Sequence, residues 1–266
     1  MSGSRLSSTF ECLRKKGVTG LVTYVTAGDP DLPRSAEILL AIDRAGADVI
    51  EIGVPFSDPI ADGPAIQRAS ERALAAGAHL KSVMELLDGM RSRLNAPVVL
   101  FTYVNPVLRY GVEDFVQWCT AIGIDGVLLL DLPIEESESM RQRLAEGGID
   151  QIFLVSPTTT DARLAEAARL GRGFLYAISR LGVTGARTAV AASARPLVDR
   201  IRAVTTLPVA VGFGLSRPEH VREVAGFGDA AVVGSALVQT IAAAAESGGD
   251  PAEAAGAFVR GLKGQR

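Results

Sequence analysis

Eight short, continuously apolar segments recur along the chain, separated by longer amphipathic segments rich in alanine and leucine. Continuous rather than alternating apolar character is typical of parallel strands that are buried on both faces. The predicted strands span residues 20–26, 47–53, 97–103, 125–131, 150–156, 173–179, 207–213 and 230–235. The pattern therefore predicts a strand followed by a helix, repeated eight times.

The intervening segments have the features of helices. Residues 34–46 are amphipathic, and residues 137–148 begin with acidic residues and end in glycine, as the ends of helices prefer. Residues 1–17 are predicted to form an extra helix before the first strand. Residues 236–264 are predicted to form the last helix, interrupted near S-G-G-D-P.

Eight consecutive strand–helix units predict an α/β fold of the (β/α)8 type, the TIM barrel, with an extra N-terminal helix. The alternative is a doubly wound open sheet, which more often carries a G-x-G-x-x-G turn after its first strand. Here that turn reads T-A-G-D-P, so the barrel is favoured. A chain of 266 residues that is 48% hydrophobic can build one such core, and we expect a single domain over residues 1–266.

Charge and hydropathy exclude several kinds of partner. The net charge of -3 and the pI of about 5.5 give no general attraction to nucleic acid or to an anionic membrane. No apolar run approaches the roughly 20 residues that a bilayer span needs. The start, M-S-G-S-R-L-S-S, lacks the apolar core of a signal peptide. We therefore expect a soluble cytoplasmic protein.

Several catalytic chemistries lack their residues. Cys12 and Cys119 have no C-x-x-C spacing, which predicts reduced thiols, and cysteine and histidine are too few for a typical metal site. His79 and His220 both lie in helix-like segments, which disfavours a Ser-His-Asp triad. The lysines are Lys15, Lys16, Lys81 and Lys263. None of them ends an apolar strand, which argues against a Schiff-base aldolase.

Active sites of (β/α)8 barrels lie at the carboxyl ends of the strands, and a carboxylate stands near one such end. Glu51 interrupts the apolar run V-I-E-I-G with no basic neighbour in sequence. Burial raises the pKa of such a carboxyl toward neutrality, which suits a group that gives and takes a proton near pH 7. The alternative is that Glu51 pairs with a distant arginine for structural reasons.

A second carboxylate follows on the next loop. Asp62 is expected to be better solvated than Glu51 and to stay ionised, so that the two could divide acid and base roles. Asp58 and Asp62 also have a structural alternative, because Asp-Pro and Asp-Gly are common turn formers. Other polar residues at predicted strand ends are Tyr103, Asp131 and Tyr176.

Glycine-rich turns follow the seventh and eighth strands. G-F-G-L-S and V-V-G-S-A let backbone N–H groups approach an anion, and a helix N-terminus adds partial positive charge. Together they predict a monophosphate site with Ser235 as a hydroxyl donor; the alternative is that the glycines only make tight turns. Residues 180–195 are predicted to be a long loop over the barrel mouth, either a lid or a disordered connection.

Five motifs occur in a fixed order: V-T-A-G-D-P, E-I-G-V-P-F-S-D-P-I-A-D-G-P-A-I-Q, L-L-L-D-L-P-I-E-E, S-R-L-G-V-T-G-A-R and V-G-F-G-L-S. In this order and spacing they resemble the α chain of tryptophan synthase over essentially the whole chain. The resemblance implies a (β/α)8 barrel that cleaves indole-3-glycerol phosphate to indole and glyceraldehyde 3-phosphate. It also implies that Glu51 is the general acid/base and Asp62 the second catalytic carboxylate.

The resemblance extends to binding residues, a partner and a cofactor. The implied residues are Tyr103, Tyr176 and Thr184 for the substrate, and Gly185, Gly214, Gly234 and Ser235 for the phosphate. The implied partner is the tryptophan synthase β chain in an α2β2 complex, which receives indole through a tunnel. Pyridoxal phosphate belongs to that partner, so this chain is expected to carry no cofactor.

The departures from the family pattern are small, and three other interpretations stand beside it. Tyr24 stands where other members carry a different aromatic or aliphatic residue, and Ile134 where proline or valine is common. One alternative is a stand-alone indole-3-glycerol phosphate lyase that needs no β chain. Another is a catalytically idle, activating barrel, which the presence of both Glu51 and Asp62 disfavours. The third is another phosphate-binding barrel, which the scarcity of lysine and the long second motif disfavour.

Overall fold

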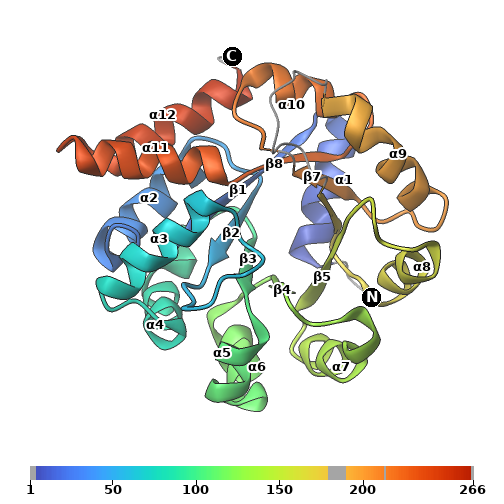
Figure 1. The fold of residues 1–266 in the computed structure, drawn as a ribbon, viewed down its shortest axis with the longest axis horizontal. Coiled ribbons are helices and arrows are strands. Elements are labelled where there is room, and N and C mark those ends of the chain that lie inside the picture. The colour runs from blue at the N-terminus through green and yellow to red at the C-terminus, as the bar shows by residue number, and fades with distance from the viewer. Residues whose placement is uncertain (1–3, 179–189, 213, 265–266) are drawn as a thin grey trace.

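The computed structural model describes residues 4–178, 190–212 and 214–264, and these form a closed barrel of parallel strands (Figure 1). The strands are β1 Gly20–Thr26, β2 Val49–Gly53, β3 Val98–Thr102, β4 Gly126–Leu129, β5 Asp150–Val155, β6 Leu175–Ile178, β7 Val209–Gly212 and β8 Ala230–Val233. They pair in chain order, and β1 also pairs with β8, which closes the barrel. The predicted (β/α)8 fold is confirmed, and each observed strand lies within its predicted range.

Helices surround the barrel (Figure 1). They are α1 Arg5–Lys16, α2 Leu32–Arg44, α3 Pro64–Ala75, α4 Leu80–Met90, α5 Val104–Tyr110, α6 Val112–Ile122, α7 Glu138–Glu146, α8 Asp161–Leu170, α9 Val190–Arg202, α10 Pro218–Val224, α11 Ser235–Glu246 and α12 Pro251–Lys263. Two short 3₁₀ helices are η1 Arg91–Arg93 and η2 Ile134–Glu136. The extra N-terminal helix and the break between α11 and α12 are as predicted. Among the described residues, no helix is both long and apolar enough to cross a membrane.

One predicted loop is partly wrong. Residues 190–195 belong to α9, so the predicted loop over residues 180–195 cannot extend through them. The segment V-A-A-S-A at the start of α9 is rich in alanine, which has the highest intrinsic helix propensity. The rest of the predicted loop, residues 180–189, lies outside the described residues. Helix α9 begins directly after it.

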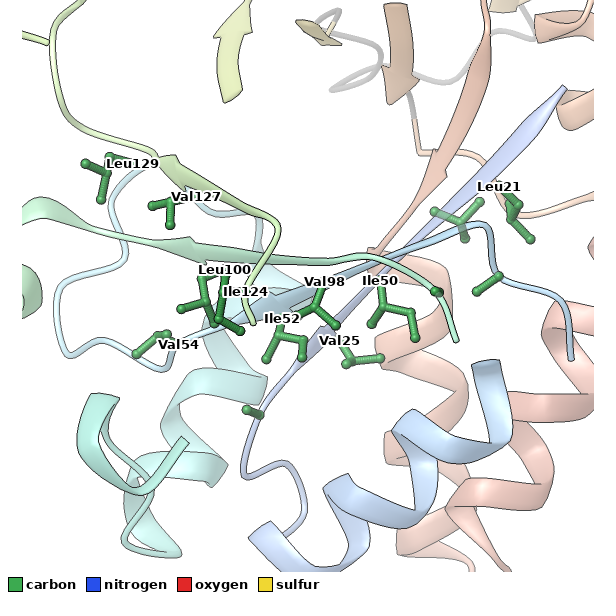
Figure 2. Packing of buried hydrophobic residues seen from close by; sticks show 14 of the residues in the cluster. Leu21, Val25, Ile50, Ile52, Val54, Val98, Leu100, Ile124, Val127 and Leu129 are labelled. Carbon is green, nitrogen blue, oxygen red and sulfur yellow. The ribbon is translucent and has the colours of Figure 1, made fainter. Parts of the chain in front are cut away.

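Alternate residues of each strand face opposite sides of the barrel wall. Ile50 and Ile52 belong to the cluster that packs between the strands and the outer helices (Figure 2). Val49 belongs to a separate cluster inside the barrel. Because side chains alternate along a strand, Glu51 points into the barrel with Val49. Strand β2 thus carries apolar residues on its outer face and the Glu51 carboxylate on its inner face.

Helix α1 closes the amino-terminal end of the barrel. Leu6, Phe10 and Leu13 are buried in the interior cluster, and the Phe10 ring centroid lies 5.4 Å from that of Phe174. The C-cap Gly17 has φ 63°, a left-handed conformation that glycine adopts without strain and that ends the helix before β1. With this end filled, a site inside the barrel can open only at the carboxyl ends of the strands.

Candidate active site

Glu51 is completely buried near the carboxyl end of β2. Its strand neighbours in register are Tyr24 on β1 and Val99 on β3. Its side chain is 0% exposed, and neither carboxyl oxygen has a hydrogen-bond partner among the described residues. Burial raises the pKa of Glu51 to about 8. The carboxyl group is therefore mostly protonated at neutral pH, and no described arginine pairs with it.

Asp62 lies on the loop between β2 and α3, and a tyrosine holds its carboxylate. The Tyr103 hydroxyl donates a hydrogen bond of 2.9 Å to Asp62 Oδ2. Burial raises the pKa of Asp62 to about 6, although the Tyr103 hydrogen bond opposes the shift. Asp62 is nevertheless partly exposed whereas Glu51 is fully buried, so Asp62 is the better solvated of the two, in agreement with the expectation. The order of the two pKa values is as expected, so between pH 6 and 8 Glu51 carries a proton and Asp62 is mostly ionised.

Tyr103 ties the Asp62 loop to β3. It follows the last residue of β3, and its hydroxyl accepts a hydrogen bond of 3.2 Å from the Ala61 N–H. The ring centroids of Phe56 and Tyr103 are 4.9 Å apart. The resemblance implied that Tyr103 binds the substrate, but not that it bonds to Asp62. The strand order could have indicated this contact, because β2 and β3 are neighbours in the barrel and their carboxyl ends lie side by side.

Two phenols lie beside Glu51 inside the barrel, the buried Tyr24 and the partly buried Tyr176. The Tyr24 hydroxyl lies against Gly53, and the Tyr176 hydroxyl lies against Gly212. The Tyr24 and Phe101 ring centroids are 5.2 Å apart at an interplanar angle of 78°. Burial and the nearby carboxylates raise the pKa of both phenols, so both stay neutral. The result is an aromatic wall beside a buried acid.

The glycine turns lie on neighbouring strands, as their sequence positions suggested. Gly214 follows β7, is exposed, and has φ 62°. Gly234 caps α11, which begins at Ser235, and no described side chain bonds to the N–H groups at this helix start. The backbone of Gly234 packs on Tyr24, since a Cβ there would lie 3.3 Å from Tyr24 Cβ. The free N–H groups of α11 therefore adjoin the aromatic wall and can meet an anion.

The remaining predicted site residues divide into two groups. Thr184 and Gly185 lie outside the described residues. Asp58 is exposed and accepts a hydrogen bond of 2.6 Å from Ser57, as a turn residue does. Across the described part of the chain, no group of three or more His, Cys, Asp and Glu residues could hold a metal ion.

A family model described as tryptophan synthase alpha chain matches residues 10–265. This chain belongs to the tryptophan synthase alpha chain family. Relatives with that name include one from Solibacter usitatus, 49% identical over 92% of this chain and 91% of the relative. Another, from Geotalea uraniireducens, is 48% identical over 98% of this chain and 97% of the relative.

Solved structures of the family have the same fold. The alpha subunit from Legionella pneumophila superposes with a TM-score of 0.89 at 36% identity, covering 98% of both chains. A chain of Mycobacterium tuberculosis tryptophan synthase gives a TM-score of 0.88 at 38% identity, covering 98% of this chain and 97% of that one. These likenesses show that the barrel of this chain has the fold of solved alpha chains.

One further contact in this family member links the segment after β4 to the start of α5. Asp131 follows β4, and its Oδ1 accepts a hydrogen bond of 2.7 Å from the Val104 N–H. This bond satisfies a free N–H at the start of α5, directly after Tyr103. The sequence marked Asp131 only as a polar residue at a strand end. In the fold it helps to fix the residue that holds Asp62.

Proposed function

We propose that this alpha chain cleaves indole-3-glycerol phosphate to indole and glyceraldehyde 3-phosphate, with Glu51 as general acid/base and Asp62 as the second carboxylate. The observation that supports these roles is the contrast between the two groups. Glu51 is fully buried without a partner, whereas Asp62 is partly exposed and held by Tyr103. The reaction is a carbon–carbon cleavage in tryptophan biosynthesis.

The chemistry needs a proton donor and an acceptor in these two places. The bond to be broken joins indole C3 to the glycerol chain, and the substrate has no carbonyl to receive the electron pair. Protonated Glu51 delivers its proton to C3, while Asp62 accepts a hydrogen bond from the indole N–H and stabilises the positive charge that develops there. The ring then becomes an electron sink.

Bond cleavage follows from the protonated ring. A base takes the proton of the hydroxyl on the carbon next to C3, and Glu51 is ionised after the first step and able to accept it. The O–H electron pair forms the carbonyl of glyceraldehyde 3-phosphate, and the C–C electron pair returns to the ring as indole leaves. The proton given by Glu51 is thereby recovered, and the enzyme returns to its starting state.

The phosphate supplies binding energy away from the reacting bond. We assign it to the corner formed by Gly214, Gly234 and Ser235, with Gly185 as a further member by resemblance. Backbone N–H groups at the start of α11 can donate to phosphate oxygens, and the helix dipole favours the negative charge. Tyr24 and Tyr176 then flank the indole. Anchoring the substrate at this end positions C3 at Glu51.

Schiff-base chemistry is not supported by the positions of the lysines. Lys15 and Lys81 lie on exposed helix surfaces beside glutamates of their own helices. Lys263 bonds to Asp48 near the end of α12. None lies at the carboxyl end of a strand, where an amine would have to reach the substrate.

We further propose a tryptophan synthase β chain as the partner, in an α2β2 complex in the cytoplasm. Two exposed apolar side chains near the barrel mouth support a docking face: Ile60 on the Asp62 loop is 87% exposed, and Leu108 on α5 is 59% exposed. Pyridoxal phosphate is assigned to the partner and no cofactor to this chain. The free thiols of Cys12 and Cys119 suit a reducing compartment.

Indole release by the purified chain tests these assignments. Slow release from indole-3-glycerol phosphate by the chain alone, with strong activation by a tryptophan synthase β chain, is the expected result. Fast release without the partner would instead identify a stand-alone lyase. Binding of the substrate without release in either case would leave an idle binding subunit and overturn the role of Glu51.

A further inference from the structure

We propose that Gln67 is a positioning residue for Asp62. Gln67 lies near the start of α3, and its Nε2 donates hydrogen bonds of 2.9 Å to the Asp62 carbonyl and 3.2 Å to the Pro59 carbonyl. The proposal rests on the proposed function, because it concerns the carboxylate assigned to the indole N–H.

The loop of residues 54–63 is held by few side chains. Among the described residues, only Tyr103 and Gln67 bond to this loop from side chains outside it. Tyr103 contacts the carboxylate of Asp62 and the N–H of Ala61, whereas Gln67 contacts backbone carbonyls. The two therefore have different effects: Tyr103 orients the carboxylate, and Gln67 orients the peptide from which that carboxylate extends.

The bonding capacity of the groups explains why an amide stands at this position. Carbonyl oxygens only accept, so the NH₂ end of Gln67 must face them, and its two hydrogens match the two carbonyls. The Pro59 carbonyl also accepts a bond of 3.1 Å from the Asp62 N–H. Gln67 thus closes the turn from Pro59 to Asp62 and ties it to α3.

The usual ties between a loop and a helix are missing here. Gly63 caps α3 without a side-chain hydrogen bond, and Pro64, the first helical residue, has no N–H to donate. Without the Gln67 amide, the Asp62 peptide can rotate while α3 remains folded. A displacement of the order of 1 Å at a catalytic group can lower a rate about 100-fold. The effect should therefore appear in catalysis before it appears in stability.

The first test replaces the amide with a side chain of the same length. Gln67→Met should lower kcat for indole-3-glycerol phosphate cleavage about 10- to 100-fold, with KM changed less than about 3-fold and the unfolding midpoint near that of the wild type. Gln67→Glu, which offers acceptors to the two carbonyls, should be impaired at least as much. The control is Gln239→Met, an exposed glutamine on α11 that should lose nothing.

A double-mutant cycle separates positioning from a general structural role. Rates are measured by single turnover with excess enzyme over hours, so that the slow Asp62→Asn background stays measurable. If Gln67 acts through Asp62, Gln67→Met should cost less than about 3-fold in that background. An equal loss in both backgrounds, or a loss confined to KM, would overturn the proposal. Normal rates for Asp62→Asn itself would instead overturn the proposed role of Asp62, whatever Gln67→Met shows.

Discussion

At the scale of single residues, the buried carboxyl of Glu51 links function to stability. The ordinary pKa of glutamate is 4.5, and burial in the barrel raises it to about 8. Between these values the folded chain holds a proton that the unfolded chain has released, so rising pH favours unfolding. The contribution of Glu51 is most favourable to folding below pH 4.5 and is progressively lost up to pH 8. A group kept for catalysis thus weakens the fold at neutral pH.

Glu51→Gln should separate these two effects. Cleavage should fall at least about 1,000-fold, because the amide cannot give or take the proton at C3. The unfolding midpoint of the variant relative to the wild type should rise between pH 5 and pH 8, because the variant has no carboxyl group to deprotonate. Urea or thermal unfolding of both proteins at pH 5, 6.5 and 8 measures this.

The exposed Glu85 on α4 provides a matched control for that substitution. Glu85→Gln should leave both activity and the pH dependence of stability as in the wild type. Near-normal turnover by Glu51→Gln would contradict the role of Glu51. An unchanged pH dependence would contradict its burial in an unpaired state.

The pH profile of kcat/KM should report both carboxyl groups. Activity should fall below about pH 6, as Asp62 becomes protonated, and above about pH 8, as Glu51 loses the proton that it must deliver. Tyr103→Phe removes the hydrogen bond that lowers the pKa of Asp62, so the acidic limb should move to higher pH. Rates measured from pH 5 to 9.5 test this, and an acidic limb that stays in place would separate Tyr103 from Asp62.

At the scale of secondary structure elements, glycines at strand ends make room for the aromatic wall. A Cβ at Gly53 would lie 2.0 Å from the Tyr24 hydroxyl and 2.5 and 2.8 Å from two ring carbons. Gly53→Ala must therefore displace Tyr24 or the end of β2, and overpacking of this kind costs about 1–3 kcal/mol. We expect lower stability together with a loss of cleavage, because Tyr24 is next to Glu51 in strand register.

The control for Gly53→Ala is a glycine with open space. A Cβ at Gly89 on α4 meets no atom within 4 Å. Gly89→Ala should therefore keep wild-type activity and equal or slightly higher stability, since alanine favours helix more than glycine does. Melting curves and kcat/KM for the two variants form the comparison. Equal changes in melting temperature and kcat/KM for the two variants would show that the close contact with Tyr24 is not needed for function.

What the sequence predicts at this scale depends on periodicity. Parallel strands buried on two faces leave continuous apolar runs, so all eight could be found, although several runs continue past the last paired residue. Leu130, for example, is apolar but lies beyond β4. The loop of residues 54–63 has no period, and its form depends on Tyr103, which lies 41 residues from Asp62. Such contacts follow only once strand order is known.

At the scale of the whole molecule, the two ends of the barrel have different surfaces. The amino end is filled by α1, whose apolar face joins the interior cluster. At the carboxyl end, Ile60 and Leu108 expose large apolar side chains on the two elements that Tyr103 connects, the Asp62 loop and α5. A partner that covers these side chains would contact the elements that orient Asp62. Docking and activation can therefore share one face.

Leu108→Asp tests this face because it places a charge where an apolar contact is expected. Burying an unpaired carboxylate at an interface is costly, so the concentration of β chain needed for half-maximal activation should rise at least about 10-fold. Indole release without the β chain should stay at the wild-type level, since Leu108 does not contact the catalytic groups. Val204 provides the matched control: it is 43% exposed and precedes β7, at the amino end of the barrel. Val204→Asp should leave activation intact, and equal losses for both variants would move the docking face away from the mouth.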